Sequence, residues 1–117
     1  MKANHSAFYL EECTRLCIEP LDYLVSLIDS QPEAIKLSRT YIGDKHAIAL
    51  ASAIPKLSLK ELALPFNGIM NYGTLALVRA LKGTRLQRLD LSRNDFSPSC
   101  VGEICSMILD TPSLQEV

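Results

Sequence analysis

The amino-acid sequence repeats itself every 27 residues, and this period constrains the fold more than any other feature. The segment LQRLDLSRNDF at 86–96 aligns without gaps on LKELALPFNGI at 59–69. A further step back gives PEAIKLSRTYI at 32–42, and a third gives HSAFYLEECTR at 5–15, where the match is weakest. A unit that recurs in this way cannot bury its apolar face alone, whereas stacked units bury a continuous core. The repetition therefore predicts a stack of similar units.

Each unit combines the two periodicities of regular secondary structure. Apolar residues two positions apart, such as Leu89 and Leu91, predict a short strand with one buried side. Apolar residues then recur at the spacing i, i+3, i+4, i+7, as in 47–54, which marks one face of a helix. A strand followed by a helix in every unit predicts an α/β fold with parallel strands.

The pattern LxxLxLxxNxL at 59–69, repeated at 86–96 with Phe as its last residue, resembles the leucine-rich repeat. The helical half after Asn67, with Gly73, Leu77 and Leu81, is similar to the ribonuclease-inhibitor-like subclass. This resemblance implies a short solenoid with a parallel β-sheet on the concave face and α-helices on the convex face. We therefore expect one leucine-rich-repeat domain over residues 1–117, with about four repeats and a truncated fifth. The expected repeats are 5–31, 32–58, 59–85, 86–113 and the start of a fifth at 114–117.

Asn67 and Asn94 occupy the place where each predicted strand turns into its loop. A side-chain amide there can donate to and accept from backbone groups of its own and the adjacent unit. We expect both residues to satisfy buried backbone groups and to have no direct part in binding. Thr40 and Cys13 take the same place in the earlier units and should do so less completely, because their side chains are smaller.

The positions that the repeat leaves free are where function is expected. Neighbouring residues in a strand point to opposite sides, so the residues beside the buried leucines should form an exposed concave face. Aromatic and arginine side chains are favoured at protein interfaces, and Phe66 has no core position to fill. Packing of Phe66 over a loop is the open alternative. The predicted protein-binding residues are Tyr9, Glu11, Lys36, Ser38, Arg39, Glu61, Phe66, Arg88, Asp90 and Arg93.

These features predict a non-enzymatic protein–protein interaction module or scaffold. No nucleophile and base are arranged for catalysis, and no glycine-rich phosphate loop is present, so we expect neither an enzyme nor a bound cofactor. Two alternatives stay open. One is a regulator or activator of a partner GTPase, which the resemblance to the activator of the Ran GTPase implies. The other is a self-associating, cytoskeletal component.

The expected open edge at 114–117 bears on the second alternative. An uncovered strand edge is a template for pairing with another chain. We therefore expect either a homodimer through this edge or covalent continuation into a longer chain.

Composition and charge narrow the range of partners. A net charge of −1 gives no bias toward nucleic acid, and no apolar run is long enough to span a membrane, so neither partner is expected. The four cysteines lack the tight spacing of zinc ligands and should be free thiols that fill space in the core. We expect a cytoplasmic protein, with cytoskeletal association as an option. Cations near the predicted helix ends either form a basic edge or complement helix dipoles; they are Lys56, Lys60, Lys82, Arg85 and Arg88.

Overall fold

Three short strands form a parallel sheet in the computed structural model, which describes residues 5–117. The strands are β1 (Ala34–Lys36), β2 (Glu61–Ala63) and β3 (Arg88–Asp90). They lie in chain order, and their register places Ile35 beside Leu62 and Leu62 beside Leu89. Paired residues are thus 27 positions apart, so the period seen in the sequence is the register of the sheet. The central residue of each strand is buried, and its two neighbours are more exposed.

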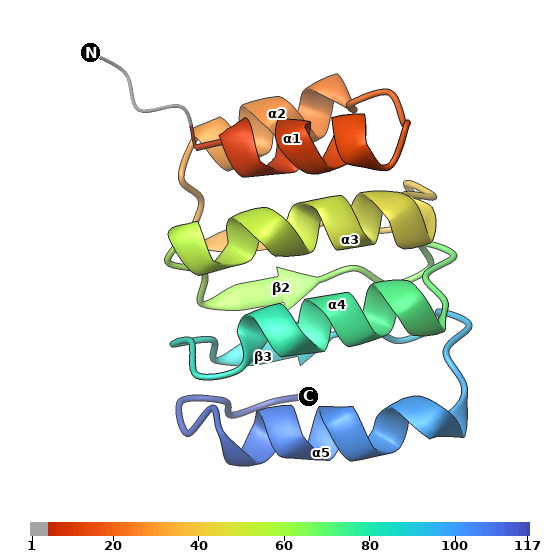
Figure 1. The fold of residues 1–117 in the computed structure, drawn as a ribbon. Helices are drawn as coiled ribbons and strands as arrows, with labels where there is room; N and C mark the ends of the chain where they lie inside the picture. Colours follow the sequence, from red (N-terminus) through yellow and green to blue (C-terminus); the bar gives the residue numbers. More distant parts are fainter. Residues whose placement is uncertain (1–4) are drawn as a thin grey trace.

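Three helices cover one side of this sheet (Figure 1). They are α3 (Gly43–Ala53), α4 (Asn71–Leu81) and α5 (Val101–Leu109). Short 3-10 helices extend two of them: η1 (Ile54–Lys56) follows α3, and η2 (Pro98–Cys100) precedes α5. The core lies between helices and sheet, where leucine and isoleucine side chains are fully buried. No helix within residues 5–117 is long and apolar enough to cross a membrane.

The expected solenoid of about four leucine-rich repeats with a truncated fifth is wrong. The described part of the chain forms five α-helices and a sheet of only three strands, which are too few strands for four such repeats. The segment expected to be the first repeat, 5–31, contains α1 (Ala7–Arg15) and α2 (Asp22–Asp29) and no strand. At 114–117 a single parallel bridge, Arg88 with Glu116, replaces the expected start of a fifth repeat. The fold is a small α/β fold.

The first segment is helical because its buried residues are four positions apart. Tyr9 and Cys13 are both fully buried, and residues at i and i+4 share one face of a helix. Phe8, which the strand reading assigned to the core, is 43% exposed. The same holds for α2, where Leu24 and Ile28 are buried. The alternation of apolar residues around Tyr9 was therefore misleading.

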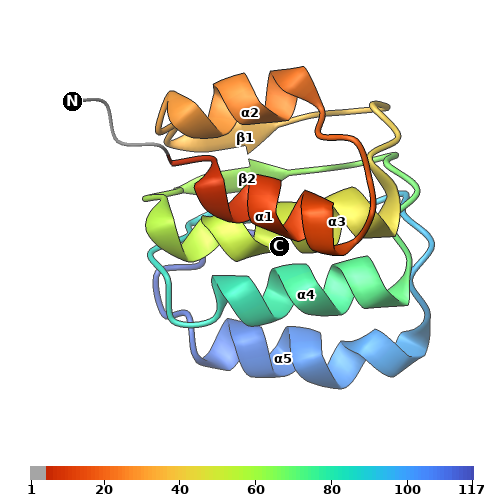
Figure 2. The ribbon, with the colours of Figure 1, turned by 45° about the horizontal axis from the view of Figure 1, so that its top comes forward.

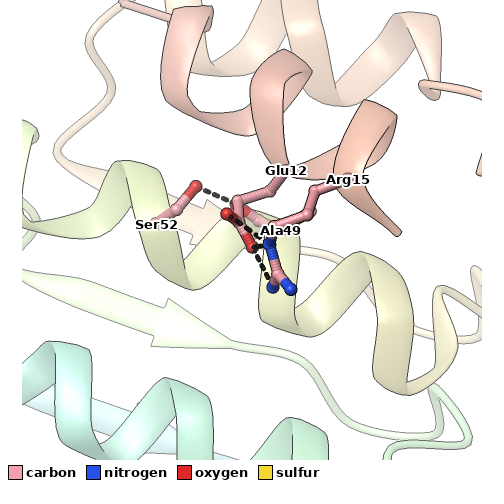
Figure 3. A network of polar contacts seen from close by, with 4 residues as sticks. All are labelled: Glu12, Arg15, Ala49 and Ser52. Atoms are coloured by element: carbon pink, nitrogen blue, oxygen red, sulfur yellow. Dashed lines mark hydrogen bonds and ion pairs between the residues drawn. The ribbon is translucent and has the colours of Figure 1, made fainter. Parts of the chain in front are cut away.

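Helix α1 packs against α3, and α2 lies beyond β1 at the outer edge of the sheet (Figures 1 and 2). On α1, the Arg15 guanidinium contacts the Glu12 carboxylate at 2.6 Å, one helical turn away (Figure 3). Close by on α3, the Ser52 hydroxyl donates to the carbonyl oxygen of Ala49 at 2.6 Å. The N-terminal helices thus cover one end of both the helix layer and the sheet.

Asparagine side chains join the units at the strand exits, as the sequence predicted. Asn67 is fully buried; its Nδ2 donates to the carbonyl oxygen of Leu37 at 2.7 Å, and its Oδ1 accepts from the backbone N–H of Thr40 at 3.1 Å. Asn94 repeats the arrangement one unit later, with Nδ2 donating to Leu64 O at 2.8 Å and Oδ1 accepting from Asn67 N at 2.9 Å. Each amide therefore satisfies backbone groups of the neighbouring unit.

A second link between units, at the helix starts, was not predicted from the sequence. Asp44 Oδ1 accepts from the backbone N–H of Met70 at 2.5 Å, just before α4 begins. Asn71 Oδ1 accepts from the N–H of Ser97 at 2.7 Å, just before η2 begins. Asp44 and Asn71 are 27 positions apart, so each helix holds the start of the next.

Candidate protein-binding face

The side of the sheet that faces away from the helices is exposed, and we call it the strand face. Its residues flank the buried central residue of each strand. They are Ala34 and Lys36 on β1, Glu61 and Ala63 on β2, and Arg88 and Asp90 on β3. Four of these six residues are charged and two are alanines, so the surface offers mainly charged groups.

Four charged residues of the strand face and the C-terminal segment form two exposed ion pairs. Lys36 Nζ lies 3.3 Å from Glu61 Oε1, and Arg88 Nε lies 3.7 Å from Glu116 Oε2. Exposed pairs of this kind contribute little to stability, about 0–1 kcal/mol. Lys36, Glu61 and Arg88 can therefore exchange these partners for groups on another protein.

Asp90 lies beside a hollow of about 300 Å³ on the strand face. The Ser92 side chain and the Ser92 backbone N–H, which donates to Asp90 Oδ1 at 2.9 Å, hold the pKa of Asp90 below its ordinary value. Its carboxylate therefore stays charged at neutral pH. The hollow is lined by Glu61, Ala63, Arg88, Leu89, Asp90, Glu116 and Val117.

Just past the strands, Phe66 lies between two arginines. The Arg39 guanidinium carbon is 4.2 Å from the centre of the Phe66 ring, and that of Arg93 is 5.9 Å from it. Both distances fall within the range of cation–π contacts. The ring is still 36% exposed, and neither arginine forms an ion pair with any residue of the described range 5–117. We call these three residues the Arg–Phe–Arg cluster.

The backbone of this cluster is unusual. Arg39, Phe66 and Arg93 have φ values of 58°, 57° and 59°, in the left-handed region that glycine adopts most easily. For residues with a side chain this conformation costs about 1–2 kcal/mol each. The backbone N–H of Arg39 donates to Pro65 O at 3.2 Å, and that of Phe66 donates to Ser92 O at 3.3 Å. These bonds extend the pairing of the strands and hold the three side chains in line.

Two predicted site residues lie on helix α1 and not on or just past a strand. Tyr9 is fully buried in α1; its hydroxyl accepts from Leu21 N at 3.0 Å and lies 3.0 Å from His46 Nδ1. Burial raises the pKa of Tyr9, so the hydroxyl keeps its proton. Glu11 is exposed, but on α1. Both residues were placed on a first strand that the fold does not contain. Ser38, by contrast, is exposed just after β1.

Sequence reasoning missed two exposed apolar residues near the start of α4, Met70 and Tyr72. Tyr72 is 76% exposed. Met70 is 55% exposed and directly precedes α4. A signal existed for Tyr72, because the equivalent residues one period away, Lys45 and Ser99, are polar. An apolar residue that replaces polar ones in a repeat is a candidate for binding.

The four cysteines are free thiols. Cys13 and Cys100 are buried, as predicted, whereas Cys17 and Cys105 are exposed. Within residues 5–117, no group of three His, Cys, Asp or Glu side chains could hold a metal ion.

No protein-family model matches the sequence, and no curated protein matches it either.

Proposed function

We propose that this chain is a non-enzymatic module that binds a protein partner through the strand face and the adjoining Arg–Phe–Arg cluster, with this cluster as the centre of the contact. The observation that carries this proposal is an exposed aromatic ring held between two guanidinium groups without ion pairs. Arginine and aromatic side chains supply most of the energy at protein interfaces. The left-handed backbone adds support, because strained residues are often kept where they serve binding.

Binding of this kind would use the rigidity of the sheet. The side chains of the strand face are fixed by paired strands, so little conformational entropy is lost when a partner binds. The guanidinium groups of Arg39 and Arg93 can each form bidentate hydrogen bonds to a carboxylate. The Phe66 ring between them can cover an apolar side chain. The partner is therefore expected to present acidic groups on either side of an apolar one.

The resemblance of 59–69 and 86–96 to leucine-rich repeats supports the same proposal, since proteins of that family share the binding of other proteins. We propose the cytoplasm as the compartment. The support is that Cys17 and Cys105 are exposed and unpaired, and exposed thiols persist where the environment is reducing.

The test is a quantitative pull-down with the double variant Phe66→Ala, Arg93→Glu. Wild-type protein, this variant and a control variant are compared by mass spectrometry of the proteins that they retain. The control is Leu109→Ala, Lys45→Glu, which makes the same two kinds of change at exposed residues on the helices. Proteins that bind through the strand face should be depleted at least about tenfold with the first variant, because hot-spot residues each contribute 2 kcal/mol or more.

The control variant should retain the same proteins as the wild type. If both double variants lose the same proteins, or if neither loses any, the strand face is not the binding surface. Circular dichroism of all three proteins shows that a loss of binding is not a loss of folding.

A further inference from the structure

A groove of about 690 Å³ lies where the helices end and the strands begin. Its walls are the segment 54–60, between α3 and β2, and the segment 79–87, between α4 and β3. In Figure 1 these loops are at the left, whereas the loops that carry the Arg–Phe–Arg cluster are at the right. The groove is therefore at the opposite end of the strands from the proposed binding centre. Its volume is within the range of ligand-binding sites.

The floor of the groove is apolar. Ile54, Leu59 and Leu81 line it and are buried in the core, and Leu57 and Ala80 are partly exposed beside them. An apolar side chain of a bound ligand would be removed from water here and would pack against residues of the core.

The rim of the groove is cationic. Lys60, Arg79, Lys82 and Arg85 line it, and no carboxylate is among the lining residues. Positive charge near the end of α4 also suits the negative end of the helix dipole. That accounts for Lys82, which directly follows α4, and less well for Lys60 and Arg85, which come just before strands. We call this site the basic groove.

Three of the four cations have partners outside the groove. The pairs are Lys60 Nζ with Glu33 Oε2 at 3.7 Å, Arg79 Nη2 with Glu103 Oε1 at 3.4 Å, and Lys82 Nζ with Asp110 Oδ2 at 3.4 Å. Pairs between such exposed groups are weak and exchange easily. Arg85 forms no ion pair within the described residues. The groove thus keeps a surplus of positive charge above an apolar floor.

We infer that the basic groove binds a short acidic peptide segment of a partner protein, with an apolar side chain of that segment on the floor and its carboxylates on the rim. Charge complementarity selects the acidic residues, and the floor selects the apolar one. A single-stranded nucleic acid fits less well, because no aromatic side chain lines the groove to stack on bases. The inference is independent of the strand face, since the two surfaces share no residue.

The test measures fluorescence anisotropy with a labelled synthetic peptide in which one leucine is flanked on both sides by glutamates. The full-length protein is titrated as wild type, as Arg85→Glu and as Lys45→Glu. Arg85 and Lys45 are both exposed, and the two changes alter the net charge equally, but Lys45 lies on α3 outside the groove. We expect Arg85→Glu to weaken binding by about fivefold or more and Lys45→Glu by less than about twofold at physiological salt.

Three further probes decide what the groove recognises. Replacing the glutamates of the peptide by glutamine, or its leucine by serine, should each weaken binding by about fivefold or more. A labelled oligouridylate of equal charge should bind more weakly than the peptide. The inference is overturned if the peptide does not bind, if Lys45→Glu weakens binding as much as Arg85→Glu, if the serine peptide binds equally well, or if the oligouridylate binds as tightly.

Discussion

At the residue scale, the buried hydroxyl of Tyr9 connects three parts of the chain. It lies on α1, accepts from the backbone N–H of Leu21 before α2, and contacts His46 Nδ1 on α3. The backbone donor occupies one lone pair of the oxygen, and a neutral imidazole can pair with the hydroxyl as acceptor or as donor at Nδ1, according to its tautomer. Burial lowers the pKa of His46 and so favours this neutral form.

This contact predicts a dependence of stability on pH. In the unfolded chain His46 takes up a proton near pH 6.5, whereas in the folded chain its pKa is lower. Between these two values the unfolded state binds more protons, so the free energy of unfolding should fall as the pH is lowered below about 6.5. The variant His46→Asn keeps an acceptor for Tyr9 but cannot titrate, and it should lack this part of the decrease. Urea denaturation at a series of pH values measures it.

The other histidine of the chain supplies the control. The variant His5→Asn leaves His46 and its contact with Tyr9 in place, so it should retain the part of the decrease that is assigned to His46. Equal pH dependence for the wild type and His46→Asn would contradict the assignment of the effect to His46.

Residues were predictable where the repeat fixed their role. Asn67 and Asn94 were placed correctly because a buried turn needs an amide at that position in every unit. Lys36, Arg39 and Phe66 were placed correctly on the exposed side because the leucines beside them fixed the direction of each strand. Tyr9 was not, because its neighbours fit a strand as well as a helix, and only packing against α3 decides between them.

At the element scale, α4 and η2 are each held by the helix before them. The Asp44 carboxylate on α3 needs room above α4 to reach the Met70 N–H, and Gly73 provides it. A β carbon at Gly73 would lie 2.7 Å from Asp44 Oδ1 and 2.8 Å from Ile69 Cγ2. The glycine is therefore required by a close approach of two helices.

Two glycine-to-alanine variants test this requirement. Alanine favours a helix over glycine by about 1 kcal/mol, so Gly102→Ala on α5, where the new methyl group meets nothing within 4 Å, should stabilise the protein by about 0.5–1 kcal/mol. Gly73→Ala should instead destabilise it by about 1–3 kcal/mol, because crowding exceeds the gain in helix propensity. Chemical denaturation measures both. Equal changes for the two variants would show that Asp44 moves aside without cost.

Elements were predictable from periodicity alone only where strand and helix were both present in a unit. The three strands and the three helices that follow them lie where the alternation and the helical spacing indicated. The segment before residue 32 has buried residues four apart in both of its helices, Tyr9 with Cys13 and Leu24 with Ile28. The wrong prediction of a strand in this segment arose because the 27-residue period was extended to it.

At the scale of the whole molecule, both edges of the sheet are covered. Helix α2 lies beyond β1 (Figures 1 and 2), and the C-terminal segment lies beside β3, where Glu116 O accepts from Leu89 N at 3.0 Å and Gln115 N donates to Gln87 O at 2.8 Å. Covered edges do not offer free backbone groups for pairing with a second chain. The N-terminal helical segment therefore covers one edge of the sheet, a role that the prediction of a first repeat did not include.

Removing residues 1–31 should therefore cause self-association. The truncated protein would uncover the outer edge of β1 and the surface of α3 against which α1 packs. We expect it to form dimers or larger species in size-exclusion chromatography with light scattering. A protein that lacks only residues 1–4 is the control and should match the full-length chain. A truncated protein that is folded by circular dichroism and monomeric at high concentration would contradict the protective role of α1 and α2.

The 27-residue register has a consequence for how such a chain can change in length. The links between units, from Asn94 to Asn67 and from Asp44 to Met70, all join positions that are fixed by this spacing. After an insertion or deletion of one whole unit, each of these hydrogen bonds could still form between equivalent positions. The last unit shows the tolerance of this rule, because Arg88 pairs with Glu116, 28 positions further on. Variation in length is thus expected to occur in whole units.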